Sequence, residues 1–247
     1  MSMTMTYTLI SARSTFRNTR FMIFTLALPL VMYLLFNGLY GNQQEGLSGI
    51  SVSAYLMVSM AAYGGLGAAI NAGARVAVER QTGWNRQLRL SALSPRSYIS
   101  SKSAVALLVA LPAVILVFLA GLLVGHVRMP IGLWLGAGLG VWIALIPFAV
   151  AGLVIGFVAG VDAVQPLTVL VYMGMSILGG LWFPVDQLSP FLRGVAKVLP
   201  SYWVGEVGHS VLGRQGIPGT GVLVLAAWTV GLGLFGALAY RRSGRKA

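Results

Sequence analysis

The stretch SAVALLVALPAVILVFLAGLLVG, residues 103–125, contains no charged side chain. A helix rises about 1.5 Å per residue, so around 20 apolar residues cross the roughly 30 Å hydrocarbon layer of a membrane. Five further apolar stretches are comparable, at approximately residues 21–40, 51–74, 131–160, 164–184 and 221–240. Pro147 predicts a kink in the longest of them. The sequence therefore predicts an all-α integral membrane protein, with six transmembrane helices in a single domain, residues 1–247.

The composition is typical of a chain whose main solvent is lipid. Hydrophobic residues make up 57% of the sequence and charged residues 9%, whereas an ordinary globular domain is roughly 25% charged. The net charge of +12 would favour a nucleic-acid partner if the basic residues formed one soluble patch. They lie instead in short stretches between apolar runs, so we expect membrane lipid as a partner and no nucleic acid. The absence of cysteine excludes disulfides and thiolate metal sites.

The basic residues also predict the orientation of the chain in the membrane. With a cytoplasmic N-terminus, only Arg128, Arg193, Lys197 and Arg214 fall on the outer side, and the other 13 of the 17 lysines and arginines fall inside. Cytoplasmic loops of membrane proteins carry such an excess of positive charge. We therefore expect a multi-pass protein of the cell inner (cytoplasmic) membrane, with both termini in the cytoplasm because the number of spans is even.

Residues 1–20 are expected to form an amphipathic helix on the inner membrane surface. Arg13, Arg17 and Arg20 follow the i, i+4, i+7 spacing that places side chains on one face of a helix. Anionic lipid headgroups attract such a face. The alternative is an irregular basic flank that only sets the topology.

Glycines recur at four-residue spacing in the fourth span. They are Gly132, Gly136 and Gly140, followed by Gly152, Gly156 and Gly160. Such a pattern allows two helices to pack closely, either between two subunits or within one chain. We favour packing within the chain.

The longest inner loop contains a candidate docking helix, residues 79–93. Trp84 and Leu88 form an apolar pair at i, i+4 among charged neighbours, and Pro95 ends the helical pattern. A mixture of apolar and charged residues suits contact with a cytoplasmic partner. A solvated basic face is the alternative.

Residues 185–213, on the outer side, are too apolar for a free loop. Ser189 can cap a helix that begins at Pro190, and Pro200 ends that helix before a second one starts at Ser201. Both helices are too short to span a membrane. We expect a re-entrant helical hairpin that dips into the outer leaflet.

No nucleotide or metal site is expected in this chain. A phosphate-binding loop needs a lysine after a glycine, and none of the lysines, Lys102, Lys197 and Lys246, follows one. Glu206 and His209 lie at i, i+3, but a metal site needs three or four ligands. We interpret this pair as a polar anchor at the outer surface.

Two sets of residues resemble the motifs of a known family, the permease subunits of type-2 ABC exporters. The inner-loop motif of that family is similar to Glu79, Gly83, Leu88, Leu93, Pro95 and Lys102. The outer motif is similar to Gly180, Phe183, Pro184, Leu199 and Pro200, followed by Glu206. The order of these motifs relative to the spans covers nearly the whole chain. The chain departs from the family at Gln81 and Thr82, where members often carry further charge.

The resemblance implies the fold and the partners of an exporter permease. Two permease copies, or two related subunits, would pair above two ATPase subunits that hold ATP and Mg²⁺, while this chain would bind no cofactor and catalyse no reaction. The resemblance assigns ATPase coupling to Glu79, Gly83, Trp84, Leu88 and Leu93. It assigns an outer gate to Phe183, Pro184, Pro200 and Glu206. The permeases would form a path for a hydrophobic or amphipathic substrate such as a drug, an antibiotic or a lipid.

Three other functions remain open at this point. An ion-coupled secondary transporter usually places ionisable residues deep in its spans, and here almost every charge lies near a predicted span boundary. A lipid-modifying enzyme would need a convergent group of acids, bases or metal ligands, which the sequence does not offer. A membrane scaffold without transport activity is compatible with the same pattern.

Overall fold

The computed structural model describes residues 3–41, 50–81 and 95–243, and over these residues all the regular structure is helical. The elements are α1 (Met3–Phe16), α2 (Thr19–Tyr40), α3 (Val52–Ala74), α4 (Val76–Gln81), α6 (Pro95–Leu123), α7 (Ile131–Ala144), α8 (Ile146–Val158), α9 (Val161–Leu178), the short 3-10 helix η2 (Val185–Gln187), α10 (Pro190–Val198), α11 (Pro200–Leu212) and α12 (Gly219–Ser243). Within these ranges, 6 helical stretches are long and apolar enough to cross a membrane. The expectation of an all-helical chain with six candidate spans is confirmed.

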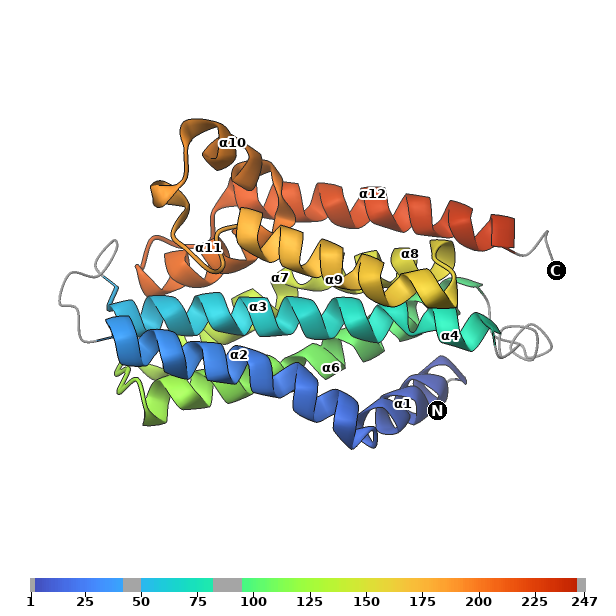
Figure 1. Cartoon of the computed structure of the whole chain (residues 1–247), viewed down its shortest axis with the longest axis horizontal. Helices are drawn as coiled ribbons and strands as arrows, with labels where there is room; N and C mark the ends of the chain where they lie inside the picture. The colour runs from blue at the N-terminus through green and yellow to red at the C-terminus, as the bar shows by residue number, and fades with distance from the viewer. Residues whose placement is uncertain (1–2, 42–49, 82–94, 244–247) are drawn as a thin grey trace.

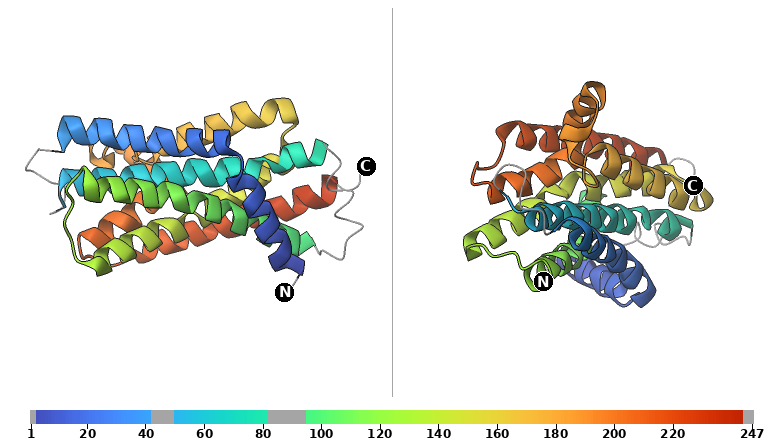
Figure 2. Two further views of the ribbon diagram at one scale, coloured as in Figure 1. Left: turned by 90° about the horizontal axis from the view of Figure 1, so that it is seen from below. Right: turned by 60° about the vertical axis from the view of Figure 1, so that its left-hand side comes forward.

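The long helices run side by side along one axis of the molecule (Figure 1). We call its two ends the α4 end and the α11 end. The α4 end holds α4, the beginning of α6 and both described chain ends, and the α11 end holds α10 and α11 (Figures 1 and 2). The N- and C-terminal helices thus reach the same end of the bundle, as an even number of spans requires.

α3 is the central helix of the bundle. In the most apolar window of the span formed by α3 and α4, 89% of the residues are buried, against 11% for α2 and 6% for α12. Small residues let the neighbouring helices approach α3 closely, among them Gly64, Gly65, Gly67, Ala68 and Ala69. Close packing of this kind stabilises helix association in lipid, where the hydrophobic effect does not drive helices together. The outer helices α2, α9 and α12 expose long apolar faces to their surroundings.

Four of the six regularly spaced glycines pack within the chain, whereas a Cβ atom at Gly132 or Gly160 would meet nothing within 4 Å. A Cβ atom at Gly73 of α3 would lie 2.8 Å from the carbonyl carbon of Gly152 in α8, and one at Gly156 would lie 3.1 Å from the Gly73 carbonyl oxygen. Gly136 and Gly140 of α7 face valines of α11 in the same way. The interpretation as intrachain packing is confirmed at these positions.

Three expected helix boundaries differ in the structure or carry a break. The third span begins earlier than expected, because α6 starts at Pro95 and not at residue 103. The fourth span is broken at Leu145, between α7 and α8, with Pro147 in the first turn of α8, so the predicted kink is confirmed. The fifth span, expected to reach residue 184, ends at Leu178. Gly180 follows with φ +74°, a left-handed conformation that ends a helix and favours glycine.

The interfacial helix is shorter than the expected residues 1–20. α1 ends at Phe16, and Asn18 begins the next helix by accepting a hydrogen bond from the Phe21 amide at 3.1 Å. Arg17 therefore lies in the turn and Arg20 in the first turn of α2, so the expectation that these two share one helical face with Arg13 was wrong. α1 lies at an angle to α2 and packs on α6 (Figure 2).

Candidate functional site

An ion pair joins α4 to α6 at the α4 end. The Lys102 ammonium lies 2.5 Å from Oε1 of Glu79, with 9% and 29% of the two side chains exposed. The Tyr98 hydroxyl donates a hydrogen bond to Oε2 of Glu79 at 3.3 Å, and the Lys102 ammonium lies 5.4 Å from the centroid of the Tyr7 ring. These contacts bring together α1, α4 and α6. Because the pair is largely removed from water, the attraction between its charges is stronger than in an exposed pair, and this attraction offsets the cost of their desolvation.

Arg80 fastens α4 to a second helix. Its Nη1 donates hydrogen bonds to the carbonyl oxygens of Gly156, at 3.0 Å, and Phe157. These carbonyls belong to the last turn of α8, where the helix leaves acceptors unpaired and a positive charge is favourable. We call the Glu79–Lys102 pair and the Arg80 contacts together the α4 clamp.

The α4 clamp lies at the base of the segment in which the docking residues were predicted. Residues 82–94 connect α4 to α6, so Glu79 and Lys102 tie together the two helices from which this segment extends. The predicted docking residues Gly83, Trp84, Leu88 and Leu93 lie outside the described residues. Glu79 is described, and its carboxylate is paired with α6.

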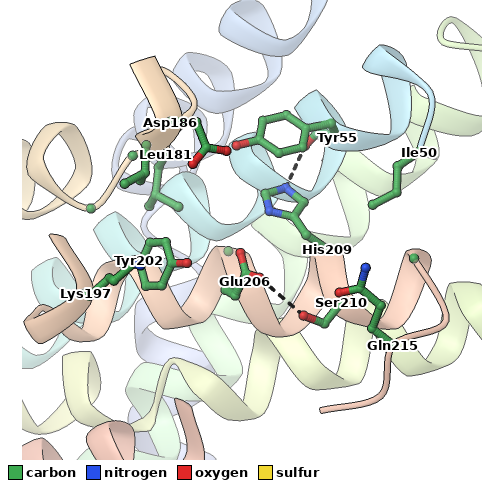
Figure 3. A pocket seen from close by; sticks show the side chains of 15 residues that line it. Ile50, Tyr55, Leu181, Asp186, Lys197, Tyr202, Glu206, His209, Ser210 and Gln215 are labelled. Carbon is green, nitrogen blue, oxygen red and sulfur yellow. Dashed lines mark hydrogen bonds between the residues drawn. The ribbon is translucent and has the colours of Figure 1, made fainter. Parts of the chain in front are cut away.

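A small polar cavity of about 180 Å³ lies at the α11 end, between α3, α11 and the chain around η2 (Figure 3). The ring of His209 stacks on the ring of Tyr55, with centroids 4.0 Å apart and planes at 8°. Nε2 of His209 donates to the Tyr55 carbonyl oxygen at 3.2 Å and lies 3.2 Å from the Ser59 hydroxyl. Ser210 donates to Glu206 at 3.5 Å. The pair of Glu206 and His209 was expected to be a polar anchor at the outer surface. His209 lies at the α11 end, where its half-buried ring packs against α3.

Burial shifts the pKa values of the ionisable groups on α11. It lowers the pKa of His209 to about 4 and raises the pKa of the Glu206 carboxyl. Burial, together with the carboxylates of Glu206 and Asp186, raises the pKa of Tyr202 to about 12. The imidazole is therefore neutral at pH 7, and its contacts with Tyr55 require no counter-ion.

The hairpin predicted at residues 185–213 is present as two short helices. Ser189 caps α10 by accepting a hydrogen bond from the Leu192 amide at 3.4 Å, as predicted. Pro200 begins α11 directly, one residue earlier than expected. α10 projects away from the bundle, whereas α11 packs on α3, α7 and α12 (Figure 1).

The four residues assigned to an outer gate lie in different surroundings. Glu206 lines the polar cavity, together with Leu181 and Val185 from the turn after α9. Phe183 is 54% exposed, Pro184 directly precedes η2, and Pro200 begins α11. The structure therefore does not gather these four side chains into one cluster.

A larger cavity, of about 590 Å³, opens between α2, α3 and α9 near the α4 end. Polar side chains at this cavity include Arg20 from the first turn of α2, Arg75 from the end of α3, and Gln165 from α9. The sequence pattern did not identify it. Its residues come from three separate spans. The signal available in the sequence was that Arg20 directly precedes the first span and Arg75 directly follows the second.

Comparisons with known proteins identify the family of this chain. Residues 4–212 match the family model described as ABC-2 type transporter. The chain is also 25% identical over 214 residues to the "Putative transport permease YvfS" of Bacillus subtilis (strain 168), an alignment that covers 86% of each protein. ATP hydrolysis in such transporters belongs to a separate subunit, in agreement with the absence of a phosphate-binding loop. The chain belongs to the ABC-2 type transporter family and is a non-catalytic transmembrane permease component.

Proposed function

We propose that this permease is the membrane part of an exporter for a hydrophobic or amphipathic substrate, such as a drug, an antibiotic or a lipid. Two ATPase subunits drive it from the α4 end, and a second copy of the chain, or a related permease, completes the transport path. The α4 clamp is the observation that supports this proposal best. The α4 clamp connects the two helices that flank residues 82–94 to the spans, so a partner that pushes on this segment would move the spans as well.

The positions of charge support a cytoplasmic α4 end. Arg13, Arg75, Arg80 and Lys102 lie at this end, and the termini reach it as well. By the positive-inside rule, the α4 end then faces the cytoplasm, and the α11 end faces outward. ATP is available at the cytoplasmic side, where the ATPase subunits would dock.

Glu79 acts in this mechanism as a positioning residue. Its carboxylate holds Lys102 and accepts from Tyr98, so a force on residues 82–94 reaches α6 through the ion pair and α3 through α4. Arg80 passes the same force to α8. Movement of these three spans relative to α2 and α9 would change access to the transport path. The hairpin of α10 and α11 would close the path on the outer side.

Co-expression with a candidate ABC ATPase subunit from the same organism tests the proposal. The complex is purified, reconstituted into liposomes, and assayed for ATP hydrolysis. We expect hydrolysis that depends on the permease and falls severalfold in Glu79→Lys and in Lys102→Glu. The double variant Glu79→Lys/Lys102→Glu restores the ion pair with its charges exchanged and should recover most of the activity.

A control and two outcomes define the limits of this test. Arg214→Gln, an exposed substitution at the α11 end, should leave hydrolysis unchanged. Normal assembly and hydrolysis after replacement of residues 82–93 by a Gly-Ser linker would overturn the coupling proposal. Transport that persists without ATP and stops when the proton gradient is dissipated would identify an ion-coupled transporter instead. Among the described residues the acidic groups are Glu79, Asp162, Asp186 and Glu206, and all of them lie near span ends or outside the spans.

A further inference from the structure

The cavity between α2, α3 and α9 has a cationic opening. Arg75 follows the last turn of α3, and its guanidinium carbon lies 5.3 Å from the centroid of the Phe21 ring. Its Nη1 atom is buried and has no hydrogen-bond partner in the part of the chain that the structure describes. Arg20 lines the same cavity from α2. A buried guanidinium N–H without an acceptor is unfavourable, so this site is suited to a ligand that supplies one.

The described residues around the cavity offer no negative charge to these arginines. None of the side chains that line it is acidic, and the ion pair found in the described ranges is the one between Glu79 and Lys102. The other polar side chains that line the cavity are neutral: the amides of Asn18, Asn71 and Gln165 and the hydroxyls of Thr25 and Tyr172. These groups can donate hydrogen bonds but add no charge. The opening therefore favours an anion over a cation.

The cavity becomes apolar with distance from the arginines. Phe21, Phe24 and Leu28 lie on one wall, and Leu28 is two turns beyond Arg20, roughly 12 Å along α2. On the opposite wall, Gly67 has no side chain, and a Cβ atom there would lie 2.7 Å from the Tyr172 ring. The volume of about 590 Å³ is within the usual range for small-molecule sites. A charged opening and an apolar interior match the two halves of an amphiphile.

We propose that this cavity binds an anionic amphiphile, with its phosphate or carboxylate on Arg75 and Arg20 and its hydrocarbon chain along Phe21, Phe24 and Leu28. The arginines lie at the membrane-interface level of α2 and α3, where a lipid headgroup also lies. The ligand chemistry is shared by two sources, an anionic phospholipid and the exported substrate. Assignment of the substrate as the occupant rests on the proposed function, whereas the binding itself does not.

Titration calorimetry of the purified full chain in a neutral maltoside detergent tests the binding. The probe is octyl phosphate, and octanol and octyltrimethylammonium serve as matched ligands without the negative charge. We expect octyl phosphate to bind and the other two to bind far more weakly. Arg75→Gln should weaken binding about tenfold through loss of a charge-assisted contact, and Arg75→Lys, which keeps the charge but not the fork of donors, should weaken it less.

Arg13→Gln is the matched control, because Arg13 is an exposed arginine of α1 that does not line the cavity. Its binding of octyl phosphate should equal that of the unmodified chain. Equal weakening in Arg13→Gln and Arg75→Gln would overturn the proposal in favour of general surface attraction. Unchanged binding in both Arg75 variants would overturn it as well. If Arg75→Gln changed the oligomeric state measured by light scattering but left the binding of octyl phosphate unchanged, the proposal would be overturned. The cavity would then be a contact between permease copies.

Two further measurements separate the sources of the ligand. If a phospholipid is the occupant, mass spectrometry of the purified chain detects retained phosphatidylglycerol, which Arg75→Gln loses and Arg13→Gln keeps. If the substrate is the occupant, inside-out vesicles that contain the permease and its ATPase accumulate radiolabelled octyl phosphate when ATP is added. Binding without ATP-dependent uptake or ATPase coupling would contradict the proposed function and leave the binding site intact.

Discussion

Lys102 and Glu79 form a largely buried charge pair between two helices, and removal of one partner alone should be costly to the fold. Lys102→Met leaves the carboxylate without its main partner, and we expect a loss of about 1–3 kcal/mol in unfolding free energy. The double variant Glu79→Gln/Lys102→Met removes both charges and should be closer to the unmodified chain than the single variant. Apparent melting temperatures in detergent measure the difference. Additive effects of the two single substitutions would show that the pair is not coupled.

His209 should make the stability of the protein depend on pH. Its pKa is about 4 in the folded chain and near 6.5 when unfolded, so the unfolded state binds more protons between these values. Acidification from pH 7 to 5 should therefore destabilise the fold by on the order of 1 kcal/mol through this residue. The raised pKa of Glu206 acts in the opposite direction, since acidification removes a buried charge.

The variant His209→Gln isolates the contribution of the imidazole. The melting temperature of the unmodified chain should fall by about 2–4 °C more than that of the variant between pH 7 and pH 5. Glu206, Asp186, Lys197, Tyr55 and Tyr202 face the same cavity, and their contributions are present in both proteins. Identical pH profiles would rule out titration of His209 as a source of the dependence.

At the scale of the helices, contact between α3 and α8 depends on glycine. A side chain at Gly73 would meet backbone atoms of α8 at 2.8 Å, and backbone cannot move aside as a flexible side chain can. Gly73→Ala should cost about 1–3 kcal/mol, because the helices must separate. Gly132→Ala is the control within another helix, since a Cβ atom there meets nothing within 4 Å. Equal melting temperatures for the two variants would contradict close helix packing as the role of Gly73.

At the scale of the whole molecule, the orientation in the membrane can be tested with cysteine labels. The chain has no cysteine, so each introduced thiol is unique. Gln187 is exposed at the α11 end and Ser14 is exposed on α1 at the opposite end. A membrane-impermeant maleimide should label Gln187→Cys in intact cells, and Ser14→Cys only after the inner membrane is opened. The reverse pattern would place both termini outside.

Most span boundaries were predictable to within a few residues, although α6 begins eight residues before the expected residue 103. The caps of α2 and α10 use side chains that lie within three residues of their partners. The predicted helices were wrong at Gly180 and Arg17. The apolar pattern continues past Gly180, and the basic spacing continues past Arg17, although the backbone leaves the helix at both positions. A left-handed glycine can interrupt a hydrophobic run without changing its composition.

The sequence by itself determined that the chain enters a membrane, how many spans it has, where the basic residues gather, and which family its motifs match. These properties follow from hydrophobic length and local spacing, which need no knowledge of distant contacts. Tertiary structure alone decided that Glu79 pairs with Lys102, that His209 packs on Tyr55, and that Arg75 opens onto a cavity with Arg20. In each case the partners lie on different helices, and the packing of those helices, set by small residues along α3, brings them within reach of one another.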